Sequence, residues 1–179
     1  MSSTSFVDTL PMATERLVVR RYRLDDRQDY FEIFGNPNIS KYDDFDPIDL
    51  PTATINIQEI LDWYENGSPE QSFAVELPSV KKAIGCLYHK VKKNSDIYIG
   101  YHFNEDFHGK GYAAESVAAY AYWLLEQTTG NIMAISDQDN INSINLLKKI
   151  GFEFVKNKIT KTKNNQVLKE SIFRFKKPT

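Results

Sequence analysis

Apolar and polar residues follow two different periods along this chain, and each period predicts a different kind of element. Apolar side chains spaced three and four positions apart, which mark one face of a helix, follow Asp25, Thr52, Gly111 and Asn140. Short apolar runs bounded by turn residues predict strands instead. The predicted strands span residues 14–23, 71–77, 82–91, 95–103, 132–136, 152–160 and 167–175.

Glycine and proline set the predicted ends of the helices. Gly35 and Pro37 end the first helix, and the second helix stops near Gly67. Gly151 follows the last helix at the position of a C-terminal cap. The stretch 38–50 is rich in Asp and Pro, so an irregular connection is expected there.

The order of these elements predicts an α+β fold with a mixed sheet, folded as a single domain over residues 1–179. Short polar turns separate the three strands between positions 71 and 103, which predicts an antiparallel meander. The last two strands are expected to form a hairpin around Lys163-Asn164-Asn165. The last helix is expected to turn four apolar side chains inward: Ile141, Ile144, Leu147 and Ile150.

The composition, with 41% hydrophobic and 26% charged residues, is typical of a soluble globular protein. Its apolar runs fall well short of the ~20 residues that a membrane span requires. The first residues, Met1 to Ser5, lack the basic and apolar regions of a secretory signal, so a cytoplasmic location without a membrane partner is expected. Cys86 is the one cysteine and lies in an apolar run, which predicts a buried strand residue rather than a nucleophile.

Charge is distributed unevenly, although the formal net charge is −2. Between Asp25 and Glu76 there are thirteen acidic residues and two basic ones, whereas ten basic residues and two acidic ones follow Asn145. The acidic half favours a cationic partner. A sequence pI of about 5.9 argues against nucleic acid as a partner.

The strand that ends at Phe103 leads into the glycine turn His108-Gly109-Lys110-Gly111-Tyr112-Ala113, and a helix running to about Glu126 follows. This order aims several backbone N–H groups and the positive end of the helix dipole at one point, which suits a phosphate. Gly109 and Gly111 let the backbone approach an anion closely, because they lack a Cβ atom. The turn therefore predicts a site for a phosphorylated ligand.

Two common phosphate-binding motifs fit this turn poorly. A Walker loop needs four residues between its glycines and a Lys-Ser/Thr pair after them, and both are absent. A dinucleotide-binding motif fits Gly109, Gly111 and Ala114 better, with Asp137 after the next strand. That fold begins with its glycine loop and continues with several parallel strands, whereas an antiparallel meander comes first here, so this motif is disfavoured.

A second motif lies farther along, where Asn140 begins an Asn-x-x-Ser helix that ends in Gly151-Phe152. Together with Thr14-Glu15-Arg16-Leu17, Ile84-Gly85, Ile99-Gly100-Tyr101 and the glycine turn, it resembles the GNAT acyl-CoA N-acetyltransferases. The resemblance is to the subgroup of ribosomal-protein N-terminal alanine (RimJ/RimL-type) and polyamine acetyltransferases, and it covers nearly the whole chain. It implies a mixed, mostly antiparallel central sheet flanked by helices, and direct acetyl transfer from acetyl-CoA to a primary amine in a ternary complex.

The resemblance also implies which residues bind the coenzyme. Backbone N–H groups of the glycine turn would hold the pyrophosphate, with His108 at the position where the family has Gln or Arg. The backbone around Tyr101 and Phe103 would pair with the pantetheine arm, and Asn140 would hydrogen-bond the arm from the opposite side. The implied set is Tyr101, Phe103, His108, Gly109, Lys110, Gly111, Tyr112, Ala113 and Asn140.

Acetyl transfer needs a base for the amine, whose pKa is about 10.4 for a lysine-like group, and a proton for the departing thiolate. His102 and Glu105 lie nearest to the expected coenzyme site and are the candidate bases. Three further carboxylates lie at unknown distance: Glu32, Asp43 and Asp44. The candidate acid is Ser143, which the family implies lies near the coenzyme sulfur; the alternative is that Asn140 and Ser143 cap their helix.

The first two helices and the loop between them are expected to select the acceptor, and their carboxylates favour a basic peptide N-terminus or a polyamine. No metal site is expected, because the histidines at 89, 102 and 108 lack the spacing of metal ligands. Either a monomer or a homodimer fits the sequence. Two other classes stay open: an acyl-CoA-binding or sensing domain without catalysis, and a nucleic-acid or protein-interaction module that uses the basic tail.

Overall fold

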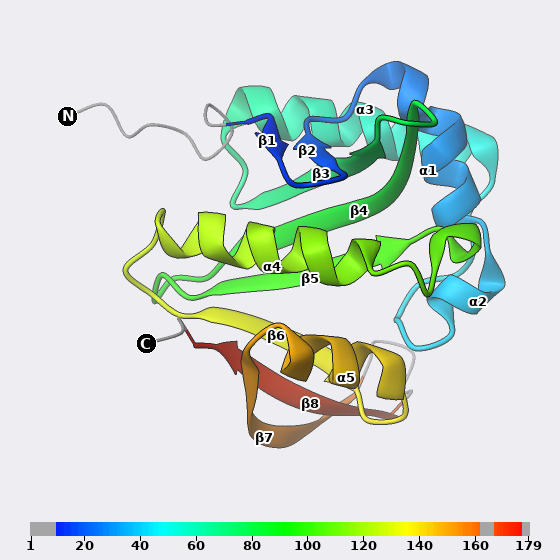
Figure 1. Ribbon diagram of the computed structural model, residues 1–179. Helices are drawn as coiled ribbons and strands as arrows, with labels where there is room; N and C mark the ends of the chain where they lie inside the picture. The colour runs from blue at the N-terminus through cyan, green and yellow to red at the C-terminus, as the bar shows by residue number, and fades with distance from the viewer. Residues whose placement is uncertain (1–9, 162–166, 177–179) are drawn as a thin grey trace.

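One eight-stranded sheet forms the centre of the computed structural model, which describes residues 10–161 and 167–176 (Figure 1). The strands are β1 (Met12–Ala13), β2 (Val18–Arg20), β3 (Glu70–Leu77), β4 (Lys82–Val91), β5 (Ile97–Phe103), β6 (Ile132–Asp137), β7 (Phe152–Lys161) and β8 (Val167–Phe175). Their order across the sheet is β1-β2-β3-β4-β5-β6-β8-β7. Neighbours β5 and β6 are parallel, and the other neighbouring pairs in the described residues are antiparallel. The prediction of a mixed, mostly antiparallel sheet is confirmed.

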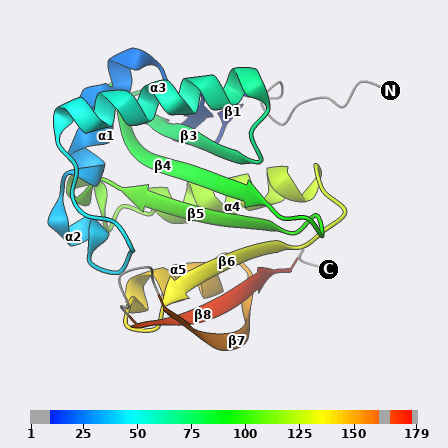
Figure 2. The ribbon, with the colours of Figure 1, turned by 180° about the vertical axis from the view of Figure 1, so that it is seen from behind.

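Helices cover both faces of this sheet. Within the described residues they are α1 (Arg27–Phe34), α2 (Pro37–Ser40), α3 (Leu50–Asn66), α4 (Tyr112–Leu125) and α5 (Ile141–Lys149), together with the 3-10 turns η2 (Leu24–Asp26) and η3 (Glu105–Phe107). The two opposite views place α4 and α5 on one face and α1 and α3 on the other (Figure 1, Figure 2). Within the described ranges, none of the helices has both the length and the apolar character to cross a membrane.

The central strands are buried on both faces, and this explains their continuous apolar runs. Residues 71–75 of β3 and 83–87 of β4 are all buried, because helices pack above and below them. Phe73, Leu87 and Leu124 are among the largest fully buried side chains. Burying a side chain of this kind contributes about 1.5–3 kcal/mol to folding, so these strands and the helices packed on them form a firm support for the site.

The predicted strand over residues 14–23 is wrong in its extent. A turn occupies its first residues, in which the Thr14 N–H donates to the Leu17 carbonyl (2.8 Å). As a result β1 lies before the predicted range, and β2 is the strand that lies within it. The helix expected after Asp25 is preceded by η2, so α1 itself begins at Arg27. These corrections share a cause, since hydrogen bonds within a turn override a loose apolar alternation.

Two other expectations need correction. Part of the stretch 38–50 is helical, because α2 runs to Ser40 and Asp49 caps α3 one residue before its start. Ile141 is 58% exposed instead of facing inward, because it occupies the first position of α5. The predicted turn at 163–165 lies outside the described residues, whereas the two strands of that hairpin are confirmed.

The separation of β5 from β6 creates the space for a site. The parallel pairs are Ile97 with Ile132, Tyr98 with Met133, and Ile99 with Ala134. From Ile135 onward β6 keeps its pairing with β8 but no longer pairs with β5. Residues 100–103 of β5 are paired with β4, and no described strand pairs with them on the side of β6. The backbone N–H and C=O groups on that edge of β5 therefore face an opening rather than a neighbouring strand.

Candidate active site

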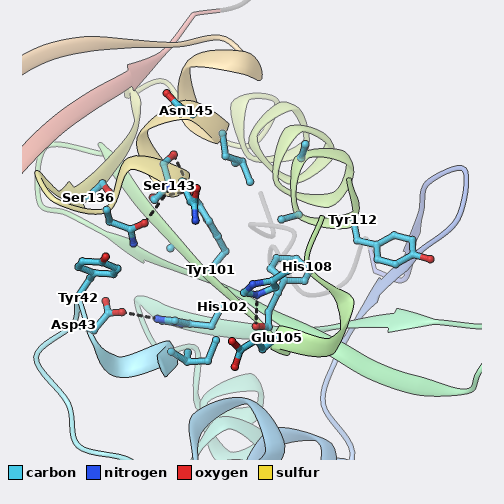
Figure 3. A pocket seen from close by; sticks show the side chains of 18 of the residues that line it. Tyr42, Asp43, Tyr101, His102, Glu105, His108, Tyr112, Ser136, Ser143 and Asn145 are labelled. Carbon is cyan, nitrogen blue, oxygen red and sulfur yellow. Dashed lines mark hydrogen bonds and ion pairs between the residues drawn. The ribbon is translucent and has the colours of Figure 1, made fainter. Parts of the chain in front are cut away.

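A cavity of about 710 Å³ lies between the separated ends of β5 and β6, with the glycine turn and α5 at its sides (Figure 3). Its size is typical of a site for a small molecule or cofactor. All of the predicted site residues line it except Lys110. The sequence gave no reason to choose several others that also line it, among them Tyr42, Asn145 and Lys149.

The glycine turn adopts the conformation that its sequence predicts. Gly109 has φ +74° and Gly111 has φ +81°, values that residues with a Cβ atom adopt rarely. Gly111 is also the N-cap of α4, and no side chain accepts a hydrogen bond at this helix end from within the described residues. The first N–H groups of α4 are therefore available to an anion, and the helix dipole favours negative charge at the same point.

Glu115 ties the N-terminal motif to this turn. Its carboxylate accepts hydrogen bonds from Thr14 Oγ1 (2.6 Å), Arg16 N (2.8 Å) and Arg16 Nε (2.7 Å). Partial burial opposes ionisation, but the Thr14 and Arg16 hydrogen bonds prevail and lower the pKa of Glu115. Arg16 in turn donates from Nη1 to the Lys110 carbonyl (3.0 Å) and lies over the Tyr112 ring. The Arg16 guanidinium is thus fixed beside the predicted phosphate site. The sequence pointed to the motif at residues 14–17 but did not predict this contact.

His108 and Lys110 use their side chains within the turn. The His108 Nε2 atom lies 2.9 Å from the Phe103 carbonyl, so a neutral ring donates its one N–H to the backbone. The Nε2–H of a neutral His108 is therefore engaged by the backbone and is not free to donate to a phosphate. Lys110 donates from Nζ to the Asp106 carbonyl (3.1 Å) and lies over the Phe107 ring, which explains why it does not line the cavity.

Glu105 lies at the mouth of the cavity with its carboxylate already engaged. Asn38 and Asn36 donate side-chain hydrogen bonds to it, at 3.0 and 2.9 Å for Oε2. Both hydrogen bonds lower the pKa of Glu105, and the bond from Asn38 has the larger effect. Glu105 is therefore a weaker base than an ordinary carboxylate. The geometry therefore disfavours Glu105 as the proton acceptor.

Tyr101 and Ser143 meet at the centre of the cavity. The Tyr101 hydroxyl lies 2.9 Å from Ser143 Oγ, and the Asn140 Oδ1 atom accepts the Ser143 backbone N–H (3.1 Å). The capping role of Asn140 is thus present, and it leaves the Asn140 amide NH2 group as the part that can donate to a ligand. Burial raises the pKa of Tyr101 to about 12, against the opposing effect of the Ser143 hydrogen bond, so this hydroxyl stays protonated at neutral pH.

His102 forms a pair with Asp43, which the connection between α2 and α3 brings to the cavity. His102 Nε2 lies 3.2 Å from Asp43 Oδ2, while Nδ1 is buried without a hydrogen-bond partner in the described part of the chain. A buried N–H without an acceptor is costly, so the favoured tautomer carries its proton on Nε2 and donates it to Asp43. The ring stacks on Tyr88 and meets Phe34 edge-on.

The other candidate carboxylates lie elsewhere. Glu32 accepts hydrogen bonds from Asn104 Nδ2 (3.1 Å) and pairs with Lys82 (2.6 Å), and it does not line the cavity. Asp44 lines a different cavity on the α3 side of the sheet. Cys86 is buried there within 3.2 Å of the Ser72 hydroxyl, and burial raises the pKa of its thiol, as expected for a strand residue without nucleophilic character.

The family model for the acetyltransferase (GNAT) domain matches residues 16–153, which is most of the chain. An uncharacterized N-acetyltransferase, p20 of Bacillus licheniformis, is 28% identical over 144 residues, covering 78% of this chain and 80% of that protein. The uncharacterized N-acetyltransferase YnaD of Bacillus subtilis is 27% identical over 144 residues, covering 78% of this chain and 81% of that protein.

Solved structures agree on the fold. The structure of RimL, a ribosomal L7/L12 alpha-N-protein acetyltransferase in complex with coenzyme A, has a TM-score of 0.76 at 14% identity and covers 92% of this chain and 96% of that chain. It is one of the ribosomal-protein acetyltransferases among the structural neighbours, in line with the RimJ/RimL-type subgroup that the motifs indicated. The matched family model, the related N-acetyltransferases and the shared fold agree, and the chain belongs to the GNAT family of acetyltransferases.

Proposed function

We propose that this acetyltransferase moves the acetyl group of acetyl-CoA directly to a primary amine, with both substrates bound at once. The observation that carries the proposal is the open edge of β5, which runs from the glycine turn to the paired hydroxyls of Tyr101 and Ser143. A coenzyme laid along that edge has its phosphates at one end and its thioester at the other. The relative solved with coenzyme A supports this cofactor.

The coenzyme site uses backbone groups more than side chains. The N–H groups from Gly109 to Ala113 and the Arg16 guanidinium hold the pyrophosphate. The free edge of β5 at Tyr101 and Phe103 pairs with the amides of the pantetheine arm, as a strand would. Asn140 donates its amide from the opposite side of the cleft.

The chemistry then needs no covalent intermediate on the protein. The neutral amine nitrogen attacks the thioester carbon, the C–S bond breaks, and the electron pair leaves on sulfur as a thiolate. The nitrogen gives up one N–H proton as the amide forms, and this proton replaces the one that Ser143 passes to the thiolate. Ser143 gives the thiolate a proton or a hydrogen bond while Tyr101 donates to Ser143. The ammonium proton that is lost before attack goes to the pair formed by Asp43 and His102. In this pair the Asp43 carboxylate contacts the amine, and the Nε2–H group of His102 donates a hydrogen bond that orients the carboxylate.

The acceptor is a cationic amine, either a peptide N-terminus or a small molecule such as a polyamine. Support comes from the carboxylates of residues 25–76 and from the relative that acetylates the N-terminus of a ribosomal protein.

Steady-state kinetics of Ser143→Ala test the proposal. Thiol release from acetyl-CoA is followed with an N-terminal alanine peptide, spermidine and simple alkylamines as acceptors. The expected result is acceptor-dependent release that falls at least ~10-fold in kcat for Ser143→Ala, with the Kd for coenzyme A within about twofold of the wild type. Ser79→Ala, in the exposed β3–β4 turn, is the matched control. Saturable coenzyme binding without release for any amine would instead favour a sensing domain.

A further inference from the structure

Tyr88 lies where the two cavities of the molecule meet. Its side chain lines the cavity of about 710 Å³ that is proposed for the coenzyme, and also the cavity of about 500 Å³ on the α3 side of the sheet. Among the described residues, Asp43 and His102 also line both. The proposed reaction uses Asp43 and His102 and leaves Tyr88 without a role.

Gly100 allows the Tyr88 ring to lie across β5. The strand register pairs Tyr88 of β4 directly with Gly100 of β5. A Cβ atom at Gly100 would lie 2.1 Å from Cζ and 2.3 Å from the hydroxyl oxygen of Tyr88. The far end of the ring therefore occupies the space that a side chain at position 100 would fill.

This position places the hydroxyl where β5 and β6 begin to separate. The last pair between these strands is Ile99 with Ala134, and Gly100 is the first residue of β5 beyond it. The Cα atom of Tyr88 belongs to β4, which lies about 4.8 Å from β5 on the side away from the opening. The hydroxyl end of the ring is therefore the part of Tyr88 that reaches the coenzyme cavity.

The Tyr88 hydroxyl is a hydrogen-bond donor without a partner. In the described part of the chain no group accepts a hydrogen bond from it. Burial and the charge of Asp43 raise the pKa of Tyr88 above its ordinary value of 10.0, so the hydroxyl keeps its proton at neutral pH. The His102 ring stacks on the Tyr88 ring, with centroids 5.6 Å apart and planes at 10°. The donor is thus held in one place with its proton available to a ligand.

The course proposed for the coenzyme brings its thioester to the same place. A pantetheine arm that pairs with the free edge of β5 at Phe103 and Tyr101 runs from the glycine turn toward Gly100. The opening ends there, because Ile99 is already paired with β6. The thioester at the end of the arm therefore lies beside Gly100 and the hydroxyl that covers it.

The reacting groups stand on either side of this point. Tyr101 reaches Ser143 on α5. The next residue, His102, points to the opposite face of the strand and pairs with Asp43 (Figure 3). With the sulfur at the hydroxyl pair and the amine at Asp43, the thioester carbon lies between them, within reach of the donor on Tyr88.

From this geometry we propose that Tyr88 is a further catalytic residue, whose hydroxyl donates a hydrogen bond to the acetyl carbonyl oxygen of acetyl-CoA. As the amine attacks, an electron pair of the carbonyl double bond moves onto this oxygen, and it returns when the C–S bond breaks. A donor fixed at the oxygen stabilises the negative charge that forms in between. The proton stays on Tyr88 throughout. The inference rests on the proposed acetyl transfer and adds the group that polarises the thioester.

Infrared spectroscopy tests this contact without turnover. Acetyl-CoA with an isotopic label at its carbonyl carbon is bound in the absence of amine, and the difference from the unlabelled complex isolates the carbonyl band. A hydrogen bond weakens the C=O bond, so the band is expected at lower wavenumber in the wild type than in Tyr88→Phe. This variant keeps the ring that packs on Gly100 and His102. Equal wavenumbers in the two proteins would overturn the proposal.

Steady-state kinetics measure the size of the effect. In Tyr88→Phe kcat is expected to fall at least ~10-fold, with the KM for acetyl-CoA and the Kd for coenzyme A within about twofold of the wild type. Tyr98→Phe is the matched control, because Tyr98 lies on the same face of β5 and lines neither cavity. It should leave kcat and the carbonyl band unchanged. A kcat that Tyr88→Phe does not lower would contradict the proposal.

Gly100→Ala tests the same hydroxyl by moving it. The new Cβ atom would collide with the far end of the Tyr88 ring, which has to leave its place over β5. The expected result is a fall in kcat similar to that of Tyr88→Phe. Adding Tyr88→Phe to Gly100→Ala should then lower kcat by no more than about twofold further, because both changes remove one hydrogen bond. Losses that multiply in the double variant would contradict the proposal.

The infrared and kinetic results separate this inference from the proposed reaction. If the wild type acetylates no amine, acetyl transfer fails as the function, and the carbonyl band still tests the contact with Tyr88. If the wild type acetylates amines and the band is the same in Tyr88→Phe, the reaction stands and the role of Tyr88 fails.

Discussion

His89 should make the protein less stable as the pH falls below 6.5. Its ring is 1% exposed, and Nδ1 lies 2.6 Å from the Tyr120 hydroxyl. Burial lowers the pKa of His89 from 6.5 to about 4 in the folded protein. Because the unfolded chain takes up a proton at His89 first, acidification favours unfolding between these two values.

The magnitude follows from the two pKa values. The interval from 6.5 to about 4 corresponds to roughly 3.4 kcal/mol, at 1.36 kcal/mol for each pH unit. The contribution is fully present above pH 6.5, is reduced by about 2 kcal/mol at about pH 5, and becomes constant below about pH 4, where both states are protonated.

Urea unfolding of the wild type and His89→Gln at about pH 7.5 and about pH 5 measures this term. Carboxylates also titrate in this range, but their effect is common to both proteins and cancels in the difference. The wild type is expected to lose about 2 kcal/mol more than His89→Gln on acidification. An equal loss in both proteins would show that His89 is not held neutral by burial.

Three further outcomes follow from contacts elsewhere. Gly130→Ala should lower the free energy of unfolding by about 2 kcal/mol or more in urea titrations, because a Cβ there would lie 2.1 Å from the Ser95 carbonyl oxygen. Arg20→Met should cost about 3–5 kcal/mol in the same assay, because it leaves Asp26 buried without its guanidinium (2.7 and 2.8 Å), and adding Asp26→Asn should recover part of the loss. Glu115→Gln should weaken coenzyme A binding by about 3–10-fold in calorimetry at a nearly unchanged Tm, because the carboxylate holds the N-terminal motif against the glycine turn.

Much of the fold could be predicted because the two apolar periods are clear in this chain. The central strands were recognised because helices bury both of their faces. The helix α2 was missed because four residues are too few for a 3.6-residue period to appear. Local hydrogen bonding also replaced the start of the first predicted strand with a turn, which an apolar pattern alone does not reveal.

The site divides in the same way between local and distant features. The glycine turn was predictable, because its function depends on backbone conformation at adjacent positions. The pairing of Asp43 with His102 was not, because 59 positions separate them and the connection that carries Asp43 has no regular pattern. Gly100 is a motif residue whose role the sequence did not reveal. A Cβ atom there would lie 2.1 Å from the Tyr88 ring, so the glycine leaves space for Tyr88, which lines both cavities.

Mass spectrometry of the reaction products tests the central claim most directly. The wild type is incubated with acetyl-CoA and each amine in turn, and free coenzyme A and acetylated amine are quantified together. Acetyl transfer predicts that both products appear in equal amounts and only when an acceptor is present. Coenzyme A released without an acetylated amine, or saturable acetyl-CoA binding with neither product, would contradict it.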